Sequence, residues 1–467
     1  MGNYFKKAGK PALINDFISL LMQNYGVDDL NLEVFRKDSH NGTTQDVKLE
    51  DEQWTKLFFC NPSQKLRLNA NPDGSTREFK IQINFKPEHR ITEHSCGAIN
   101  ALAVLGHNFY TAGVGIIGRA TFDKIGHDPE EDNYNDFISD NYGTGGMVNK
   151  SIYHFNEEPK YIANSESTAT DSGGVYLKPR TDGFSIIKCR SNILPKFTQT
   201  ESLRETYYLK EITFNIKAIG FGMDLGDYSI LHDVIISSLV CGHYYEFPVA
   251  PDMAVAVEYD FDGVKTNETV GGSEFAYIEH VGKPFQFAQG DLDVGFFSNG
   301  VNRPKGRKRH NITFSSVANR DLFPAAMIES RTIENDGVLS GSVSFSSQDD
   351  PDYNDSAIGA VASYHTNDLG WDGVYYATAV GSVITMTDSF YKNVILHTLG
   401  GALPFIFIEN IDAKFSSVGY PDGSVDYTKE QIIWDQFCVC RVDKNSFRFT
   451  QSSHNVFSVA LNVYETF

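Results

Sequence analysis

The sequence predicts a mainly β protein of more than one domain, and three observations lead to this prediction. The 34 Phe and 23 Tyr far outnumber the 7 Met, and aromatic residues fit the pleated, half-buried surface of a sheet. The 39 Gly and many clusters of Asn, Asp and Ser supply the turns that short strands require. A length of 467 residues exceeds what one hydrophobic core usually organises, so two or three domains are expected.

The bulk composition is that of a folded, acidic protein. Hydrophobic residues make up 41% and charged residues 21% of the chain, as in ordinary globular domains. The formal net charge of −20 argues against coating of nucleic acid, because such binding requires Lys and Arg at the phosphates. For the basic run Arg303–Arg309 we favour a solvated loop, or a contact with an acidic neighbouring subunit, over a nucleic-acid patch. No stretch approaches the roughly 20 apolar residues of a membrane span, and we expect no secretory signal.

Residues 1–50 are expected to form an irregular N-terminal arm. A short amphipathic helix is predicted within Leu13–Tyr25, with Asn15 as its cap and Gly26 as its end. The rest of the arm is polar. Such an arm can reach over a neighbouring subunit.

Residues 51–240 predict a first β domain. The segment FKIQINF (79–85) places every second residue, all of them Phe or Ile, on one face of a strand. A long acidic segment rich in Gly, Asn and Ser, residues 126–172, is interpreted as a surface insertion on this scaffold. Its aromatic residues Tyr134, Phe137 and Tyr142 are candidates for stacking on sugar rings.

Residues 241–467 predict a second β domain with one helix. The helix is expected at 388–400, where Asp388 is a suitable N-cap and Gly400-Gly401 ends the segment. A polar insertion is expected at 331–370. Strand-like segments occupy much of the remainder, including QFCVCRV (436–442).

Motifs of enzyme chemistry are not found in the sequence. It contains no P-loop, nucleophile elbow, HExxH or dinucleotide fingerprint, so no catalytic, cofactor-binding or metal-binding residues are predicted. The six cysteines lack the paired spacing of a zinc site. Cys438 and Cys440 would share one face of a strand, and we interpret them as two small buried apolar residues. Such cysteine usage is consistent with assembly in a reducing cytoplasm.

The histidines and acidic clusters give weaker signals. His89 and His94 are interpreted as solvated or hydrogen-bonded side chains. His107 is expected beside an apolar core, bonded to Asn108 or a backbone carbonyl. The acidic clusters are interpreted as solvated loops in preference to calcium sites, because none shows the spaced pattern that ends in a bidentate Glu.

Three segments, in this order, resemble virion structural proteins of marine tailed bacteriophages. GAINALAVLGHNFYTAGVGI (97–116) resembles the "ALxxxNHNL" segment of jelly-roll domains in phage tail proteins, with Gly106 in place of the more usual Asn. HYYEFPVAPDMAVAVEYDFDGVKTNETVGG (243–272) is similar to a run that precedes a two-stranded arm in those proteins. Residues 398–465 resemble their closing segment, with its "GGxLPFIF" strand and "FxxxRxDxNSFxF" pair.

The resemblance implies a jelly-roll-like β-sandwich, followed by a β-sandwich domain of the tail-tube or distal-tail type with one short packed helix. It further implies a non-enzymatic structural component of a phage tail, baseplate or tail adaptor. Such a subunit would be assembled in the host cytoplasm, bind other tail subunits and form homo-oligomeric rings or multimers, with no membrane and no nucleic acid as partner. The alternative is a tail protein that binds a receptor or host surface glycan through Tyr134, Phe137 and Tyr142. A polysaccharide depolymerase is a less favoured alternative, because paired carboxylates across a groove cannot be identified in the sequence.

Overall fold

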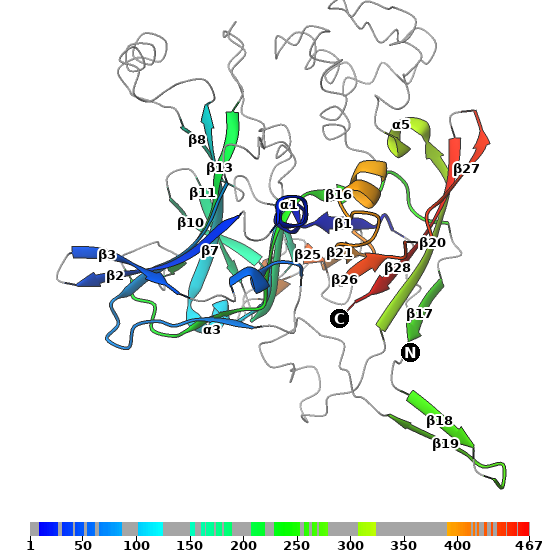
Figure 1. Cartoon of the computed structure of the whole chain (residues 1–467), viewed down its shortest axis with the longest axis horizontal. Helices are drawn as coiled ribbons and strands as arrows, with labels where there is room; N and C mark the ends of the chain where they lie inside the picture. Colours follow the sequence, from blue (N-terminus) through cyan, green and yellow to red (C-terminus); the bar gives the residue numbers. More distant parts are fainter. Residues whose placement is uncertain are drawn as a thin grey trace, which may run out of the picture.

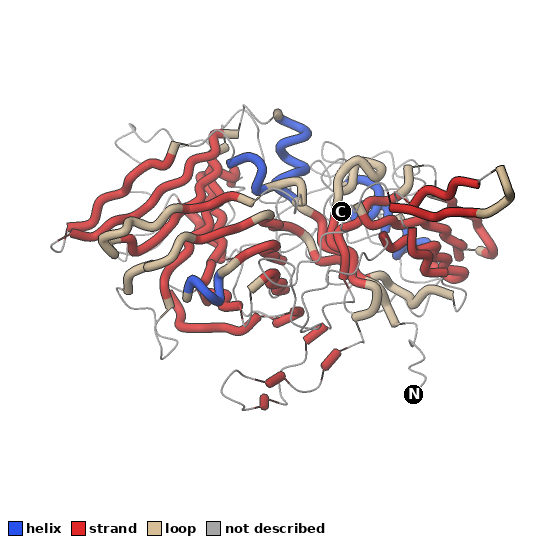
Figure 2. The backbone as a smooth tube through the Cα atoms, turned by 90° about the horizontal axis from the view of Figure 1, so that it is seen from below, coloured by secondary structure: helices blue, strands red, loops and turns tan. Residues whose placement is uncertain are grey.

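The computed structural model describes residues 9–85, 101–124, 150–188, 207–219, 228–278, 307–323 and 390–466, with short gaps inside these ranges. The described chain consists of antiparallel sheets with a few short helices (Figure 1), and strands dominate it in Figure 2. The predicted class, a mainly β protein with multidomain β-sandwich architecture, is confirmed.

Three large sheets form the framework. The strands of the outer sheet follow the order β10 (Ser165–Asp171), β11 (Gly174–Pro179), β7 (Val114–Lys124), β13 (Tyr207–Ala218), β5 (Thr76–Asn84), β2 (Asn31–His40) and β3 (Thr43–Leu49). An eighth strand, β8 (Lys150–His154), pairs with β7. The strands of the middle sheet follow the order β15 (Ser238–Gly242), β6 (Ala101–His107), β12 (Gly183–Lys188) and β9 (Lys160–Ala163). The strands of the C-terminal sheet follow the order β16 (Tyr244–Glu246), β1 (Ala12–Asn15), β21 (Phe405–Ile408), β26 (Phe437–Val442), β28 (Val456–Glu465), β20 (Arg307–Ala318) and β17 (Ala256–Asp260). An eighth strand, β27 (Arg448–Ser453), pairs with β28.

Short elements complete the described fold. The described residues also form four two-stranded sheets: β14 (Val234–Ile236) with β4 (Leu66–Leu68), β18 (Val264–Glu268) with β19 (Glu274–Ile278), β22 (Lys414–Phe415) with β25 (Gln431–Ile432), and β23 (Val418–Gly419) with β24 (Val425–Asp426). The helical segments are α1 Phe17–Tyr25, the 3₁₀ turn η1 Trp54–Leu57, α3 Phe109–Ala112, α5 Asn319–Leu322 and the π-helix η5 Tyr391–Leu396. None of the described helices is long and apolar enough to cross a membrane.

The three sheets are stacked around three hydrophobic cores. In β6, Leu102 and Val104 pack into the first core, between the outer and middle sheets, whereas Ala103 and Leu105 pack into the second core, between the middle and C-terminal sheets. Successive side chains of a strand point to opposite faces, so a middle sheet covered on both sides requires an uninterrupted apolar run. The third core lies on the far face of the C-terminal sheet and includes Phe390 of the helical segment.

The outer and middle sheets together have a jelly-roll-like connectivity. From β5 to β13 the chain crosses repeatedly between the two sheets: β6, β9 and β12 lie in the middle sheet, and β5, β7, β8, β10, β11 and β13 lie in the outer sheet. The first and last of these strands, β5 and β13, pair with each other in the outer sheet, while β6 pairs with β12 in the middle sheet. This order is characteristic of the double Greek key of a jelly roll.

The prediction of an irregular arm over residues 1–50 is wrong for the described part of that range. β1, α1, β2 and β3 form within it, and β1 lies between β16 and β21 in the C-terminal sheet, as the blue strand among orange and green ones in Figure 1. Its alternate residues serve two cores, with Ile14 in the second and Leu13 in the third. A four-residue strand carries little local signal, and only its two neighbours define it. The C-terminal sheet therefore begins at residue 12, and the boundary expected between residues 240 and 241 falls inside β15.

Helix α1 follows the sequence prediction at its end and departs from it at its start. It ends at Gly26, as predicted, where φ is +87°. The N-cap is Asp16, whose carboxylate accepts a hydrogen bond from the Ile18 amide at 3.2 Å. Asn15 is instead the last residue of β1.

The predicted surface insertion 126–172 is in part a set of strands. Residues 150–171 contain β8, β9 and β10, which pair with β7, β12 and β11. These pairings depend on neighbouring strands that the local polar composition does not specify. Residues 126–149 of the insertion lie outside the described residues, as does the polar insertion expected at 331–370.

The helix expected at 388–400 is present in the part that the structure describes, residues 390–400, with a π-helical turn at its centre. The sequence places Phe390, Val394, Ile395 and Leu399 on one stripe of this helix, and Phe390 and Val394 do face the third core. The segment ends at Gly400 and Gly401, both with positive φ. Leu399 leaves the stripe and is 40% exposed, because it adopts a left-handed φ of 50° in the terminating turn.

Candidate functional site

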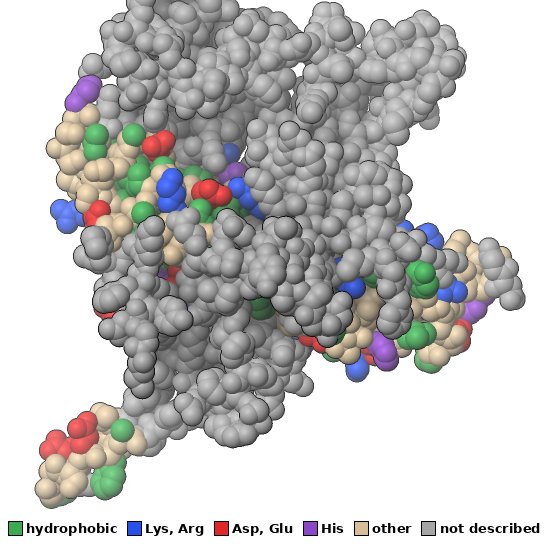
Figure 3. Space-filling view, turned by 180° about the vertical axis from the view of Figure 1, so that it is seen from behind, with side chains coloured by type: hydrophobic (Ala, Val, Ile, Leu, Met, Phe, Trp, Pro, Cys, Tyr) green, Lys and Arg blue, Asp and Glu red, His purple; other side chains and the backbone are tan. Residues whose placement is uncertain are grey.

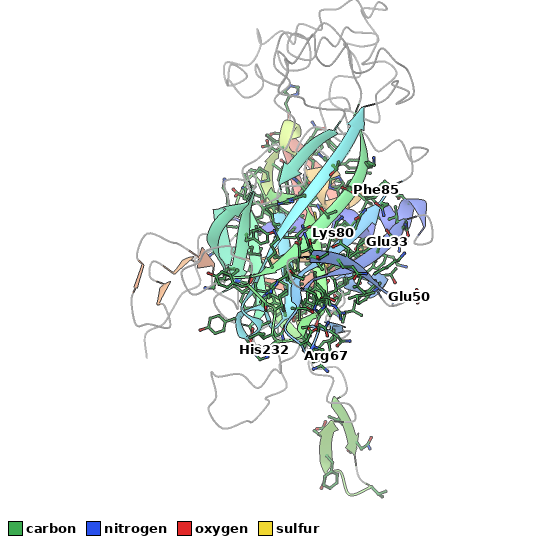
Figure 4. The ribbon with its side chains drawn as sticks, turned by 90° about the vertical axis from the view of Figure 1, so that its left-hand side faces the viewer. Glu33, Glu50, Arg67, Lys80, Phe85 and His232 are labelled. Atoms are coloured by element: carbon green, nitrogen blue, oxygen red, sulfur yellow. The ribbon has the colours of Figure 1, made fainter. Side chains whose placement is uncertain are left out.

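The β18–β19 hairpin projects from the body of the molecule (Figures 1 and 4). Among the described strands, its two five-residue strands pair only with each other, from Val264 opposite Ile278 to Glu268 opposite Glu274. Each side chain described between Thr266 and Ala276 is exposed. At roughly 3.3 Å per residue, the paired part is about 17 Å long. We call residues 264–278 the arm.

The arm has the composition of a contact surface. Phe275 is 59% exposed and Val270 is fully exposed at the turn. Carboxylates and hydrophobic side chains both gather on it in Figure 3. Glu268 and Glu274 stand opposite each other across the two strands, and like charges in that position destabilise a pair. A basic group on a binding partner would relieve this repulsion.

The outer face of the outer sheet has a different character, because its polar groups bind one another. Glu33 accepts a 2.6 Å hydrogen bond from Lys48 and one of 3.3 Å from Asn84. The hydrogen bond from Lys48 lowers the pKa of Glu33. Lys80 Nζ lies 5.8 Å from the centroid of the Phe35 ring, and Glu33 and Lys80 come from the neighbouring strands β2 and β5 (Figure 4).

This network continues across further strands. Gln82 binds Glu211 at 3.0 Å, and Glu211 also accepts from Thr121 at 3.2 Å. A sheet face of this kind is suited to water, since antiparallel sheets commonly expose one polar face. The arm is therefore the better candidate for a binding surface.

A buried cluster of polar side chains lies at one end of the third core. Lys308 and His310 come from β20, Glu409 follows β21, and Cys438 and Cys440 come from β26. Lys308 Nζ lies 2.6 Å from Glu409 Oε1, and His310 Nε2 lies 3.7 Å from the same oxygen. Cys438 Sγ is 3.9 Å from His310 Nε2 and 3.1 Å from Cys440 Sγ.

The cluster corrects the interpretation of two sequence features. The basic run Arg303–Arg309 was expected to be a solvated loop, but its residues from Arg307 on begin β20, and Lys308 is 3% exposed. Cys438 and Cys440 do share a strand face and are buried, as predicted. Their thiols also make polar contacts, with each other and with His310. The hydrogen bond with Cys440 lowers the pKa of the Cys438 thiol, and burial raises that of Cys440.

His107 is completely buried beside the first two cores, as the sequence indicates. Its Nδ1 accepts a hydrogen bond from the Phe109 amide at 3.3 Å, and its Nε2 lies 3.1 Å from Ser185 Oγ. The neutral ring therefore carries its proton on Nε2. Burial lowers the pKa of His107 to about 3. These contacts are those of a structural histidine.

The residues proposed from sequence for glycan binding, Tyr134, Phe137 and Tyr142, lie outside the described residues, as do His89 and His94. Sequence reasoning missed His310 and Glu409, which carry no motif. Their only signal is the alternation of β20 and β21, which places them on the same sheet face as Cys438.

Comparisons with protein-family models, with curated proteins and with solved structures gave no significant match.

Proposed function

We propose that this protein is a structural subunit of a tailed-phage virion, in its tail, baseplate or tail adaptor, and that it acts by assembling with further copies of itself. The observation that carries the proposal is the projecting arm with exposed Phe275 and Val270. A two-stranded hairpin is at best marginally stable alone in water. Its free edges and apolar residues gain most when another subunit covers them.

The sequence resemblance supports the place of this subunit in a phage. The segment 243–272 is similar to a run that precedes a two-stranded arm in tail proteins, and in this chain it ends with β18 and the turn of the arm. The jelly-roll-like order of the outer and middle sheets agrees with the fold which the resemblance implies. Fold likeness alone is a weak argument for function, so the arm remains the main support.

The test of assembly compares the full chain with a variant in which a short Gly-Ser linker replaces residues 264–278. Light scattering across a concentration series is expected to show an oligomer for the full chain and a monomer for the variant. At concentrations too low for association both should unfold at the same temperature, because no described residue of the arm belongs to the three cores. A full chain that stays monomeric at high concentration overturns the proposal.

The place in the virion is tested separately. An antibody raised against the chain, bound to phage particles of the same source and viewed by electron microscopy, is expected to label the tail or baseplate. Labelling confined to the head, or no labelling of particles whose other subunits are labelled, contradicts a tail location.

A further inference from the structure

We propose that the buried cluster at the end of the third core binds one thiophilic divalent cation of the zinc type, held by Cys438, His310 and Glu409 and completed by Cys440. This inference does not depend on the proposed function. It starts from three ligand atoms, one each from a His, a Glu and a Cys, that lie within 4.8 Å of one another.

Strand pairing explains why these side chains converge. β20 is separated from β26 by β28, which ends at Glu465. Cys440 pairs with Glu465, and His310 pairs with Val463. His310 and Cys438 lie on the same face of this sheet, and their side chains approach to 3.9 Å between His310 Nε2 and Cys438 Sγ. Cys438 pairs with Phe407 of β21 on its other side.

Two of the three separations are close to those between atoms that share one ion, and all three ligand atoms lie within 4.8 Å of one another. Zinc binds Cys sulfur at about 2.3 Å and His nitrogen or carboxylate oxygen at about 2.0–2.2 Å, so tetrahedral ligand atoms lie roughly 3.3–3.8 Å apart. The Cys438–His310 and His310–Glu409 separations are 3.9 Å and 3.7 Å. Cys440 Sγ, 3.1 Å from Cys438 Sγ, needs only a small displacement to become the fourth ligand.

The charges also balance around a divalent ion. The two thiolates and the Glu409 carboxylate of the ligand set carry three negative charges, which a divalent cation and the Lys308 ammonium neutralise, while the neighbouring Glu465 carboxylate accepts a hydrogen bond from the Lys308 backbone amide. Lys308 Nζ lies 2.6 Å from Glu409 Oε1, with both side chains under 10% exposed. Without a cation, three such groups would be strongly unfavourable as anions in this buried position.

Outer contacts hold the ligands in place. The His310 ring packs against Phe407, with centroids 5.2 Å apart. The backbone amide of Lys308 donates a 2.8 Å hydrogen bond to Glu465. Contacts of this kind orient metal ligands, and the burial of the site indicates a closed, structural ion that is acquired during folding.

The experiment measures metal in the full chain and in two matched cysteine variants. Protein produced in zinc-supplemented medium and dialysed is expected to hold about one zinc ion per chain by elemental analysis. Cys438→Ala should lose it, whereas Cys241→Ala, which also removes a fully buried thiol but in the first core, should keep it. Equal zinc content in the two variants, or metal-free full chain, overturns the proposal.

A second readout does not depend on whether the Cys438 variant folds. Full-length chain refolded with Co²⁺ should show the visible bands of a tetrahedral site and the ultraviolet charge transfer of a thiolate ligand. His310→Gln should weaken both bands, because one ligand is lost. Absence of these bands overturns the proposal, as does an intact mass two hydrogens below that of the reduced chain, which would indicate a Cys438–Cys440 disulfide instead.

Discussion

The side-chain amide of Asn15 donates a 3.0 Å hydrogen bond to the backbone carbonyl of Asn393, across 378 residues of sequence. The backbone amide of Asn15 also donates to the carbonyl of His243 at 3.0 Å. One residue at the end of β1 thus joins the N-terminal segment, the connection between β15 and β16 and the π-helical turn. The N-terminus is an integral part of the C-terminal sheet.

We expect Asn15→Ala to lower the free energy of unfolding by about 1–2 kcal/mol, because a buried hydrogen bond is lost at the Asn393 carbonyl. Denaturation by urea at neutral pH measures this difference. Asn462→Ala, which shortens an exposed side chain on β28, is the control and should change the free energy by less than about 0.5 kcal/mol. Equal effects of the two substitutions would refute the structural role of Asn15.

Gly242 marks the closest approach between β15 and the N-terminal segment. A Cβ atom at this position would lie 1.7 Å from the backbone carbonyl oxygen of Asn15. Gly242→Ala is therefore expected to cost about 1–3 kcal/mol or more of stability, because the two backbones must separate. The melting temperature should fall by several degrees.

Gly271 provides the matched control for this substitution. A Cβ there would meet nothing within 4 Å, so Gly271→Ala should leave the melting temperature nearly unchanged. A Gly242→Ala protein that melts with the wild type would show that β1 does not pack against β15 at this distance.

Phe275 is expected to contribute to assembly and little to folding. Phe275→Ser removes the large apolar side chain on the arm and should weaken self-association at least tenfold, as central aromatic residues often dominate interfaces. Analytical ultracentrifugation gives the association constant. Leu231→Ser removes another exposed apolar side chain, 70% exposed and outside the arm, and should leave association unchanged. If both substitutions weaken it equally, the arm is not the contact surface.

His107 and Asp16 have opposite effects on stability in acid. Burial lowers the pKa of His107 from 6.5 to about 3. Between these pH values the unfolded chain binds a proton that the folded chain does not, so His107 lowers the free energy of unfolding as the pH falls. Burial raises the pKa of Asp16 from 3.8 to about 6. Between those pH values the folded chain binds a proton that the unfolded chain does not, so Asp16 raises the free energy of unfolding as the pH falls. The two contributions largely cancel between pH 4 and 6.

Asp16→Asn should therefore reveal the contribution of His107. Asn can still accept the Ile18 amide as an N-cap. The variant is expected to lose about 1.4 kcal/mol of unfolding free energy per pH unit more than the wild type between about pH 6 and pH 4. Urea denaturation at half-unit steps of pH measures this slope. The same slope in wild type and variant would show that Asp16 is not protonated in the folded chain at these pH values.

Several features follow from the sequence alone, because they depend on neighbouring residues. Gly26 ends α1 and Gly400-Gly401 end the C-terminal helical segment, since glycine adopts positive φ at little cost. The two-residue period of a strand places Cys438 and Cys440 on one face. Aromatic content and turn residues indicate the mainly β class. Each of these signals lies within a few residues of the feature that it determines.

Only the tertiary structure decided which distant segments meet. Ala12–Asn15 is too short to be identified as a strand, and it forms because β16 and β21 offer hydrogen bonds and two cores on either side. His310 and Glu409 carry no pattern that relates them to Cys438. They converge because β20, β21 and β26 belong to one sheet and present these side chains on the same face. Pairing over such separations is selected by the free energy of the whole sheet, which no local sequence pattern contains.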